Sequence, residues 1–343
     1  MQNMSFYVHI PYCIKRCGYC DFNTYTASEL PGATRESFHK SLIREIEFSS
    51  EVLEQSSVPR RAFSSVFFGG GTPSLFEVSQ IKEILQSLEG EHGVDPGAEI
   101  TLEANPETLS REYLQKLFDA GVNRLSMGAQ SFDEDVLSTL ERKHNPAKVV
   151  EFAAVAKEIG FRTSIDLIFG APGESLESWA RTLEIASGLE TEHISCYSLI
   201  VEDGTKLAKQ IARGELSEVD EDLNAEKYEM ATNVFSAIGL DWYEVSNWGV
   251  PSTHNLAYWK SQDWWGYGPG AHSHVSGNRF WNRKHPSAYA TALEAGAPAQ
   301  GMEVLGERTR LEERLLLELR IKDGVPRILL KDLGVSPRKI SER

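Results

Sequence analysis

The sequence predicts an α/β protein built around a parallel sheet, and two observations carry this prediction: strand-like and helical segments alternate, and their apolar residues recur with different periods. Apolar, strand-like runs alternate with helical patterns from the start of the chain to about residue 245. Such repetition implies parallel strands with helices on the outside of the sheet. Six units are too few for a standard eight-stranded barrel, so we expect a partial (β/α)6 barrel, with an open doubly wound sheet as the alternative.

The expected strands and helices differ in the period of their apolar residues. Between the first two runs, Phe38, Leu42 and Ile46 recur every four residues, which predicts one face of a helix. Residues 176–186 repeat an apolar residue every three or four positions and predict another helix. The six expected strands are residues 5–10, 64–68, 99–102, 124–127, 162–169 and 193–200.

The C-terminal third of the chain differs from the rest in its composition and in its apolar periodicity. Aromatic residues and glycines crowd residues 242–283, and no β/α period continues there. From Leu311 onward, through residues 313–320, the pattern is helical, and residues 325–340 resemble the start of a small helical domain. We therefore expect a partial barrel over residues 1–245, then an aromatic and glycine-rich segment with a smaller helical domain over residues 246–343. The last helical pattern ends abruptly, so a truncated C-terminus stays an open alternative.

Composition excludes several classes of partner. The chain carries 50 acidic and 35 basic side chains, a formal charge of −15, which argues against nucleic acid or an anionic membrane surface as the main partner. No apolar run approaches the roughly 20 residues that span a bilayer, and the N-terminus lacks the pattern of a signal peptide. We expect a cytoplasmic protein. In that reducing compartment, clustered cysteines are not expected to form disulfides.

Three of the four cysteines lie within eight residues. Cys13, Cys17 and Cys20 form a C-x3-C-x2-C pattern, and short spacings of this kind let one loop wrap around a metal or cluster. A structural zinc site usually has four protein ligands, and Cys196 is far away in sequence. Three cysteines around a four-iron cluster would leave one iron open to an external ligand. Zinc binding and free thiols stay open as alternatives.

Glycines and polar residues stand at the ends of the expected strands. The triplet at 69–71 follows a buried strand and lets backbone approach a ligand, although a tight turn is the simpler explanation. Glu103, Gln130 and Asp166 lie at or near the ends of the third, fourth and fifth strands. Ligands gather at the carboxyl ends of parallel strands, so these side chains are expected at one mouth; each alone could instead cap a helix.

The cysteine pattern after a first strand resembles the signature of the radical S-adenosylmethionine (SAM) superfamily. The similarity spans about residues 5–290 and points to the coproporphyrinogen dehydrogenase branch and its sibling, the HemW-type haem chaperones. The sequence motifs that support this resemblance are FYVHIPYC, CGYCDFN, FFGGGTPS, EANPE, LSMGAQSF, ERKH, DLIFGAPGE, YSLIVEDGT and HNLAYW.

The resemblance implies a [4Fe–4S] cluster on Cys13, Cys17 and Cys20, whose open iron binds the amino and carboxylate groups of SAM. It also implies a set of SAM-site residues on the matching motifs. The methionyl part of SAM would contact Gly70, Gly71 and Thr72. Its ribose and amino end would contact Glu103 and Gln130, and its carboxylate would pair with Arg142. Asp166 would line the same site, and Tyr7 would pack near a cluster ligand.

Two departures separate the chain from the dehydrogenase branch. Those enzymes carry a further cysteine two residues after the third, where this chain has Phe22, and a longer arm before the first strand. Both departures favour the chaperone branch.

The motif H-N-x-x-Y-W, which resembles a word of the haem-binding branch, supplies a candidate haem ligand in His254. Imidazole is a normal axial ligand of haem iron, and Arg279, Arg283 and Lys284 downstream could meet its two propionates. A hydrogen-bonded structural histidine is the alternative. His272 and His274, here called the second histidine pair, could form another ligand loop or a wall of the SAM site.

The leading hypothesis is a haem-binding chaperone on a radical SAM scaffold that carries a [4Fe–4S] cluster and SAM and delivers haem to an acceptor haemoprotein. An electron donor for the cluster is expected, and dimerisation stays open. The alternative is oxygen-independent coproporphyrinogen III dehydrogenase, an enzyme of porphyrin biosynthesis; Phe22 argues against that activity. A third reading, from a different class, is a structural zinc protein.

Overall fold

The computed structural model describes residues 4–30, 35–59 and 61–334, and its centre is a run of six parallel strands. Each strand pairs with the next one in chain order, without a switch point. This order excludes the doubly wound alternative, in which the strand order reverses, and is consistent with the expected partial barrel. The strands are β1 (Met4–Ile10), β2 (Phe63–Gly70), β3 (Val94–Ala104), β4 (Arg124–Gln130), β5 (Arg162–Phe169) and β6 (His193–Ser198).

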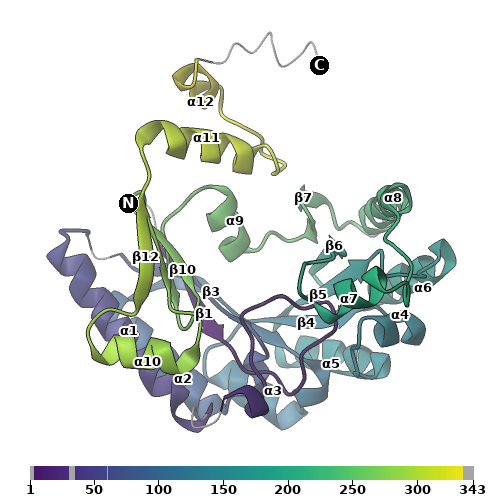
Figure 1. The fold of residues 1–343 in the computed structure, drawn as a ribbon, viewed down its shortest axis with the longest axis horizontal. Helices are drawn as coiled ribbons and strands as arrows, with labels where there is room; N and C mark the ends of the chain where they lie inside the picture. The colour runs from purple at the N-terminus through teal and green to yellow at the C-terminus, as the bar shows by residue number, and fades with distance from the viewer. Residues whose placement is uncertain (1–3, 31–34, 60, 335–343) are drawn as a thin grey trace.

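Helices cover the outer face of these strands, which confirms the α/β prediction. Figure 1 shows them along the outer side of an arc, with the later helices α9, α11 and α12 on the opposite side. No helix among the described residues is both long and apolar enough to cross a bilayer. The outer helices are α1 (Arg35–Gln55), α2 (Val78–His92), α3 (Arg111–Asp119), α4 (Glu134–Thr139), α5 (Pro146–Ile159), α6 (Leu176–Gly188), α7 (Lys206–Ala212) and α8 (Glu221–Ala237).

Local sequence fixes where several of these helices begin and end. The side chains of Ser110 and Ser175 accept hydrogen bonds from the backbone N–H groups in the first turns of α3 and α6. Helix α5 starts with Asn145 as its cap and Pro146 at its first position, and it ends at Gly160, whose φ of +112° suits glycine. The loops between helices and strands are therefore defined by ordinary capping residues.

The C-terminal part of the chain extends the same sheet at both edges. Strand β9 pairs in parallel with β1 and is followed by three antiparallel strands, while β8 pairs antiparallel with β6. Strands on both sides of residue 245 thus share one 12-stranded sheet, and the division at 245 stays a prediction about folding units. The added strands are β7 (Trp242–Glu244), β8 (Asn247–Gly249), β9 (Trp264–Tyr267), β10 (His272–Val275), β11 (Asn278–Asn282) and β12 (Ala299–Val304).

Four further helices accompany these strands. Helices α11 and α12 lie where the sequence predicted helical structure, and they pack on each other. The predicted continuation of this helical part beyond residue 334 lies outside the described residues. The four are α9 (Thr253–Trp259), α10 (Pro286–Glu294), α11 (Glu307–Glu318) and α12 (Arg327–Asp332).

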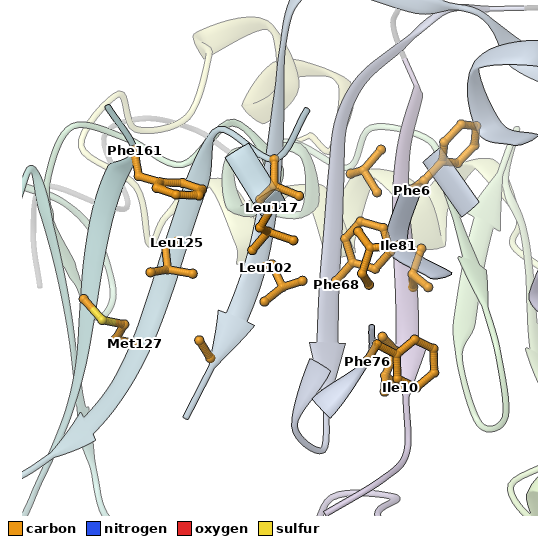
Figure 2. Packing of buried hydrophobic residues seen from close by; sticks show 14 of the residues in the cluster. Phe6, Ile10, Phe68, Phe76, Ile81, Leu102, Leu117, Leu125, Met127 and Phe161 are labelled. Atoms are coloured by element: carbon orange, nitrogen blue, oxygen red, sulfur yellow. The ribbon is translucent and has the colours of Figure 1, made fainter. Parts of the chain in front are cut away.

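Alternation along each central strand separates an apolar face from a polar one. In β1, Phe6 and Ile10 are fully buried in the core between sheet and helices, where Figure 2 shows them beside Phe68, Phe76 and Ile81. Successive strand residues point to opposite faces, so the intervening Ser, Tyr and His of β1 face inward. Similar alternation in β2 to β6 gives the sheet a polar inner face, on which the candidate site is built.

A buried charge network closes the inner face at the N-terminal ends of the strands. Both oxygens of Glu99 are engaged: Oε1 accepts from Ser252 Oγ at 3.0 Å and from the backbone N–H of His254 at 3.1 Å. Oε2 accepts from Arg162 Nη1 at 3.3 Å and lies 4.0 Å from Arg124 Nε. Glu99 therefore ties the start of α9 to the sheet, opposite the end where the strand-end residues gather.

A second buried carboxylate, Glu45 of α1, anchors the C-terminal strands to the outer helices. It accepts from Gly268 N at 2.7 Å, Asn282 Nδ2 at 2.6 Å and Tyr289 Oη at 2.5 Å. Burial is the largest effect on this group and raises its pKa to about 7, although the three donors favour the ionised form.

The substitution Glu45→Gln is expected to lower the free energy of unfolding by about 1–3 kcal/mol, because the new amide N–H₂ would face a donor. In the native chain, Glu45 stays protonated at a pH where the unfolded chain has lost the proton. This effect makes the wild type lose stability as pH rises from about 4.5 to about 7, and the variant should lack that contribution. Urea unfolding at several pH values measures both effects.

The matched control is Glu47→Gln, on the same helix but exposed, which should change stability little. Equal stabilities of the two variants at every pH would refute the anchoring role of Glu45.

Candidate functional site

The three clustered cysteines lie on the loop that follows β1. The base of this loop is closed by backbone bonds, from Cys13 N to Tyr25 O at 2.9 Å and from Tyr25 N to Pro11 O at 2.7 Å. Within it, Cys20 N donates to Cys17 O at 3.3 Å. All three thiols are half-buried and free, so the loop presents three sulfur ligands from one short segment.

Neighbouring donors point at two of these sulfurs. The hydroxyl of Thr72 lies 3.7 Å from Cys13 Sγ, and Arg142 Nη1 lies 3.6 Å from Cys17 Sγ. Burial raises the pKa of Cys13 and of Cys20, and repulsion from Cys17 adds to both shifts. A bound cation would offset this repulsion among thiolates, and hydrogen bonds to sulfur are a usual feature of iron–sulfur sites. The residues present therefore fit a [4Fe–4S] cluster.

The zinc hypothesis stays an untested alternative. Among residues 4–30, 35–59 and 61–334, no group of three His, Cys, Asp or Glu side chains is placed to hold a single metal ion. Cys196 is fully buried on β6 within the outer core, away from the loop.

Arg142 is fixed in place by three contacts rather than lying free at the surface. Besides the contact with Cys17, its Nη2 donates to Gly128 O at 3.0 Å and its Nε donates to His144 Nδ1 at 3.3 Å. The guanidinium is thus held at the end of β4, beside the cysteine loop, as the resemblance implies for a group that meets the SAM carboxylate. His144 was not among the predicted site residues, although it stands two positions further in the same ERKH word.

The glycine triplet brings backbone directly against the cysteine loop. Gly71 N donates to Ile10 O at 2.8 Å and Thr72 N donates to Tyr12 O at 2.8 Å. A Cβ at Gly71 would lie 2.5 Å from Tyr12 O, closer than real atoms approach, and Gly70 has a φ of +111°. Close packing between β2 and the loop therefore requires glycine here.

We expect Gly71→Ala to displace the cysteine loop, because the added methyl meets backbone that cannot rotate away. The melting temperature should fall, and the iron content after anaerobic reconstitution should fall with it, by an amount that atomic absorption measures. Gly90→Ala on α2 is the control: its methyl meets nothing within 4 Å and should stabilise the helix by about 0.5–1 kcal/mol. Unchanged iron content in the Gly71 variant would contradict the packing argument.

Two buried carboxyl groups face the inner side of the sheet from β3 and β5, on either side of β4. Glu103 Oε2 accepts from Gly70 N at 3.2 Å, and Asp166 accepts from Ser126 Oγ at 2.9 Å. Burial and the charge of Asp166 raise the pKa of Glu103 to about 8, and burial raises the pKa of Asp166. Two carboxyls that share a buried region favour a cationic ligand, which would restore their ionised forms.

Tyr7 and Gln130 border the same region. The Tyr7 hydroxyl lies 3.0 Å from His9 Nδ1, while His9 Nε2 donates to Asn23 O at 2.9 Å, so the imidazole links β1 to the cysteine loop. Gln130 ends β4 with a φ of +62°, and its amide lies over Gly128 beside Arg142. The structure thus brings together the residues predicted for SAM and for the cluster, and their binding roles stay predictions.

His254, the predicted haem ligand, is buried on α9 with both ring nitrogens engaged. Its exposed fraction is 1%, and its ring stacks on Phe67 with centroids 5.2 Å apart. Nδ1 bonds Ser65 Oγ at 2.9 Å and Nε2 bonds Tyr258 Oη at 2.9 Å. Burial, with Arg124 nearby, lowers its pKa to about 3. Iron ligation by His254 stays a prediction, and it would require one of these bonds to break.

The residues predicted to meet propionates are divided between the two ends of β11. Arg279 pairs with Glu303 at 2.9 Å and Glu313 at 2.6 Å. Arg283 and Lys284 are exposed at the other end, where Lys284 O accepts from Asn23 Nδ2 of the cysteine loop.

Phe22, which stands where the dehydrogenase branch has its extra cysteine, is 65% exposed.

Comparison with known proteins places this geometry in a family. The family model described as the radical SAM superfamily matches residues 7–186. The heme chaperone HemW of Mycobacterium tuberculosis is 40% identical, over 99% of this chain and 87% of its own length. The heme chaperone HemW of Bacillus subtilis is 33% identical, over 99% of this chain and 86% of its own length.

Among solved structures, the coproporphyrinogen III oxidase HemN from Escherichia coli, described as a radical SAM enzyme, superposes with a TM-score of 0.83. The superposition covers 97% of this chain and 79% of the HemN chain, at 21% sequence identity. At this identity, the match supports a shared fold and says nothing about a shared activity. The order of strands, the cysteine loop and the full-length identities to heme chaperones agree with one another. The chain belongs to the radical SAM superfamily and, within it, to the family of the HemW heme chaperones.

Proposed function

We propose that this protein is a haem chaperone: it binds haem and delivers it to an acceptor haemoprotein. The observation that carries the proposal is the 40% identity to a heme chaperone over nearly the whole chain. The exposed Phe22 supports it, because the dehydrogenase branch has a cysteine at that position.

The proposal includes two resident groups at the mouth of the strands. Cys13, Cys17 and Cys20 would hold a [4Fe–4S] cluster, and the cluster when bound supplies an iron that can accept an external ligand or an electron. SAM would lie against Tyr7, Gly70, Gly71, Thr72, Glu103, Gln130, Arg142 and Asp166. Arg142 is held in position to donate to a carboxylate, and Glu103 and Asp166 to accept from a cation.

Several partners follow from this proposal. An electron donor would reduce the cluster, and the acceptor would be a haemoprotein in the same compartment, which we place in the cytoplasm. The net charge of −15 argues against nucleic acid. A homodimer is open to test by light scattering with and without the cluster.

Titration of ferric haem into the anaerobically reconstituted full chain tests the central claim. We expect a saturable shift of the haem absorption band at one haem per chain, and transfer of that haem to an apo-haemoprotein. Incubation with coproporphyrinogen III, SAM and a reductant should yield no protoporphyrinogen IX. Formation of that product without haem binding would establish the dehydrogenase instead.

A further inference from the structure

The loop between α4 and α5 carries the ERKH motif, and its backbone is bonded to the rest of the molecule at both ends. Arg142 N donates to Leu137 O of α4 at 2.8 Å, and Asn145 N donates to Glu107 Oε1 at 2.9 Å. Asn145 also caps the first turn of α5. Arg142 and His144 are therefore presented from a short loop that is fixed on either side of them.

The guanidinium of Arg142 uses a different nitrogen for each of its contacts. Nη1 lies 3.6 Å from Cys17 Sγ, Nη2 donates to Gly128 O at 3.0 Å, and Nε donates to His144 Nδ1 at 3.3 Å. A guanidinium has five N–H groups, so these three contacts leave two N–H groups for a further acceptor. Within the described part of the chain, no carboxylate forms an ion pair with Arg142. A carboxylate of a ligand would meet a charge that the protein has not neutralised.

The imidazole of His144 is the neutral acceptor that this arrangement requires. Nδ1 can accept from Arg142 Nε only when it carries no proton, so the ring holds its proton on Nε2. His144 is 6% exposed, and burial, followed by the charge of Arg142, lowers its pKa to about 4. The ring also has a backbone contact with Ala129 of β4. His144 thus joins the guanidinium to the end of that strand.

The end of β4 makes room for the guanidinium because residue 128 is glycine. A Cβ at Gly128 would lie 2.9 Å from Arg142 Nη2 and 2.8 Å from Gln130 Nε2, closer than real Cβ atoms approach other groups. A larger residue would therefore push both side chains out of place. The guanidinium is held between the strand end, the imidazole of His144 and the cysteine loop.

We propose that His144 is a positioning residue of the SAM site, which holds Arg142 so that one guanidinium serves both the sulfur of Cys17 and the carboxylate of SAM. The bond to Nε fixes the rotation of the planar guanidinium, and this rotation decides where the two Nη groups lie. His144 acts through Arg142 and not by contact with the ligand. The inference rests on the proposed function, because it concerns the SAM of that function.

The shared guanidinium has a consequence for the cluster as well. A hydrogen bond and a positive charge beside a cluster sulfur favour the reduced cluster and raise its reduction potential. Because Arg142 Nη1 contacts the sulfur of Cys17, loosening of this side chain should weaken SAM binding and lower the cluster potential together.

The test compares His144→Ala and His144→Asn with the wild type, each as the cluster-loaded full chain. Calorimetric titration with SAM, and with decarboxylated SAM, reports on the carboxylate contact. We expect His144→Ala to bind SAM about tenfold more weakly and to bind the decarboxylated compound as the wild type does, because that compound lacks the group that Arg142 meets. His144→Asn should restore SAM binding to within about threefold, since its amide oxygen can accept from Nε.

The matched control is Lys143→Ala, which changes the exposed neighbour in the same motif and should behave as wild type in both titrations. If His144→Ala loses its iron, His144→Asn decides the question. SAM binding near that of the wild type then supports the inference, and a tenfold loss in the cluster-loaded Asn variant overturns it.

A double variant separates positioning from general damage. Arg142→Ala removes the guanidinium, so the addition of His144→Ala should not weaken SAM binding further. Redox titration should give a lower cluster potential for His144→Ala at unchanged iron content. Equal losses for SAM and decarboxylated SAM, or a further loss in the double variant, would overturn the inference. Absence of SAM binding by the wild type would instead refute the SAM site of the proposed function.

Discussion

The substitution Cys17→Ala is expected to give a colourless protein after anaerobic reconstitution, without inorganic sulfide and with near-complete loss of iron. The three thiols on one loop are the ligands that we propose for the cluster, and loss of one would leave a second iron without a protein ligand. The loss should also release Arg142 Nη1, which contacts the sulfur of Cys17. Iron and acid-labile sulfide analysis, with the visible spectrum, measures the result.

Cys196→Ala is the control for this experiment, because Cys196 is buried in the outer core and lies outside the loop. That variant should keep its cluster. The Cys17 variant should still bind haem, since the predicted haem ligand His254 lies on α9, which Glu99 ties to the other end of the strands. Simultaneous loss of cluster and haem in the Cys17 variant would show that the two sites are one.

The substitution Glu103→Gln is expected to weaken SAM binding strongly at high pH and only slightly at low pH. The pKa of Glu103 is raised to about 8, so the carboxyl is protonated at neutral pH and must lose its proton to pair with the cationic SAM. Wild-type affinity should rise by up to about tenfold per pH unit between pH 6 and 8, and then level off. Above pH 8 the variant should bind about ten- to a hundredfold more weakly, because it lacks the charge-assisted bond.

Calorimetric titration with SAM across this pH range, in buffers of different ionisation enthalpy, detects both the affinity and the proton released. Glu112→Gln, an exposed position on α3, is the control and should follow the wild type. A pH-independent affinity in the wild type would contradict the assignment of Glu103 to the SAM site.

Short-range pattern predicted the central strands well and the edge strands poorly. The expected strand at residues 162–169 matches β5 (Arg162–Phe169). Strand β3 begins at Val94, five residues before the expected start, because Pro96 and Gly97 in its first part are usual signals of a turn. Strands β9 to β11 have four or five residues each, and β9 depends on pairing with β1, about 260 residues earlier. No local pattern contains that contact.

In the candidate site, the place of a residue along its strand could be predicted from the sequence, whereas the side chains that it contacts could not. Glu103 and Asp166 could be placed together because parallel strands end at one edge, and in the structure the charge of Asp166 helps to raise the pKa of Glu103. The support of Arg142 by His144 and the hydrogen bonds of His254 depend on side-chain packing between distant segments. One available signal was missed: Glu99, Thr101 and Glu103 alternate with apolar residues and mark a polar inner face.

The position of β1 has a consequence for how the protein is made. One edge of this apolar strand pairs with β2, but the other pairs with β9, at Trp264 to Tyr267. On the ribosome, most of the chain must emerge before that second edge can be covered. Until then the nascent protein presents an uncovered strand edge, the kind of surface on which unfinished chains aggregate. Assembly of the sheet is therefore completed late in translation, and this interval is where holdase chaperones would be needed most.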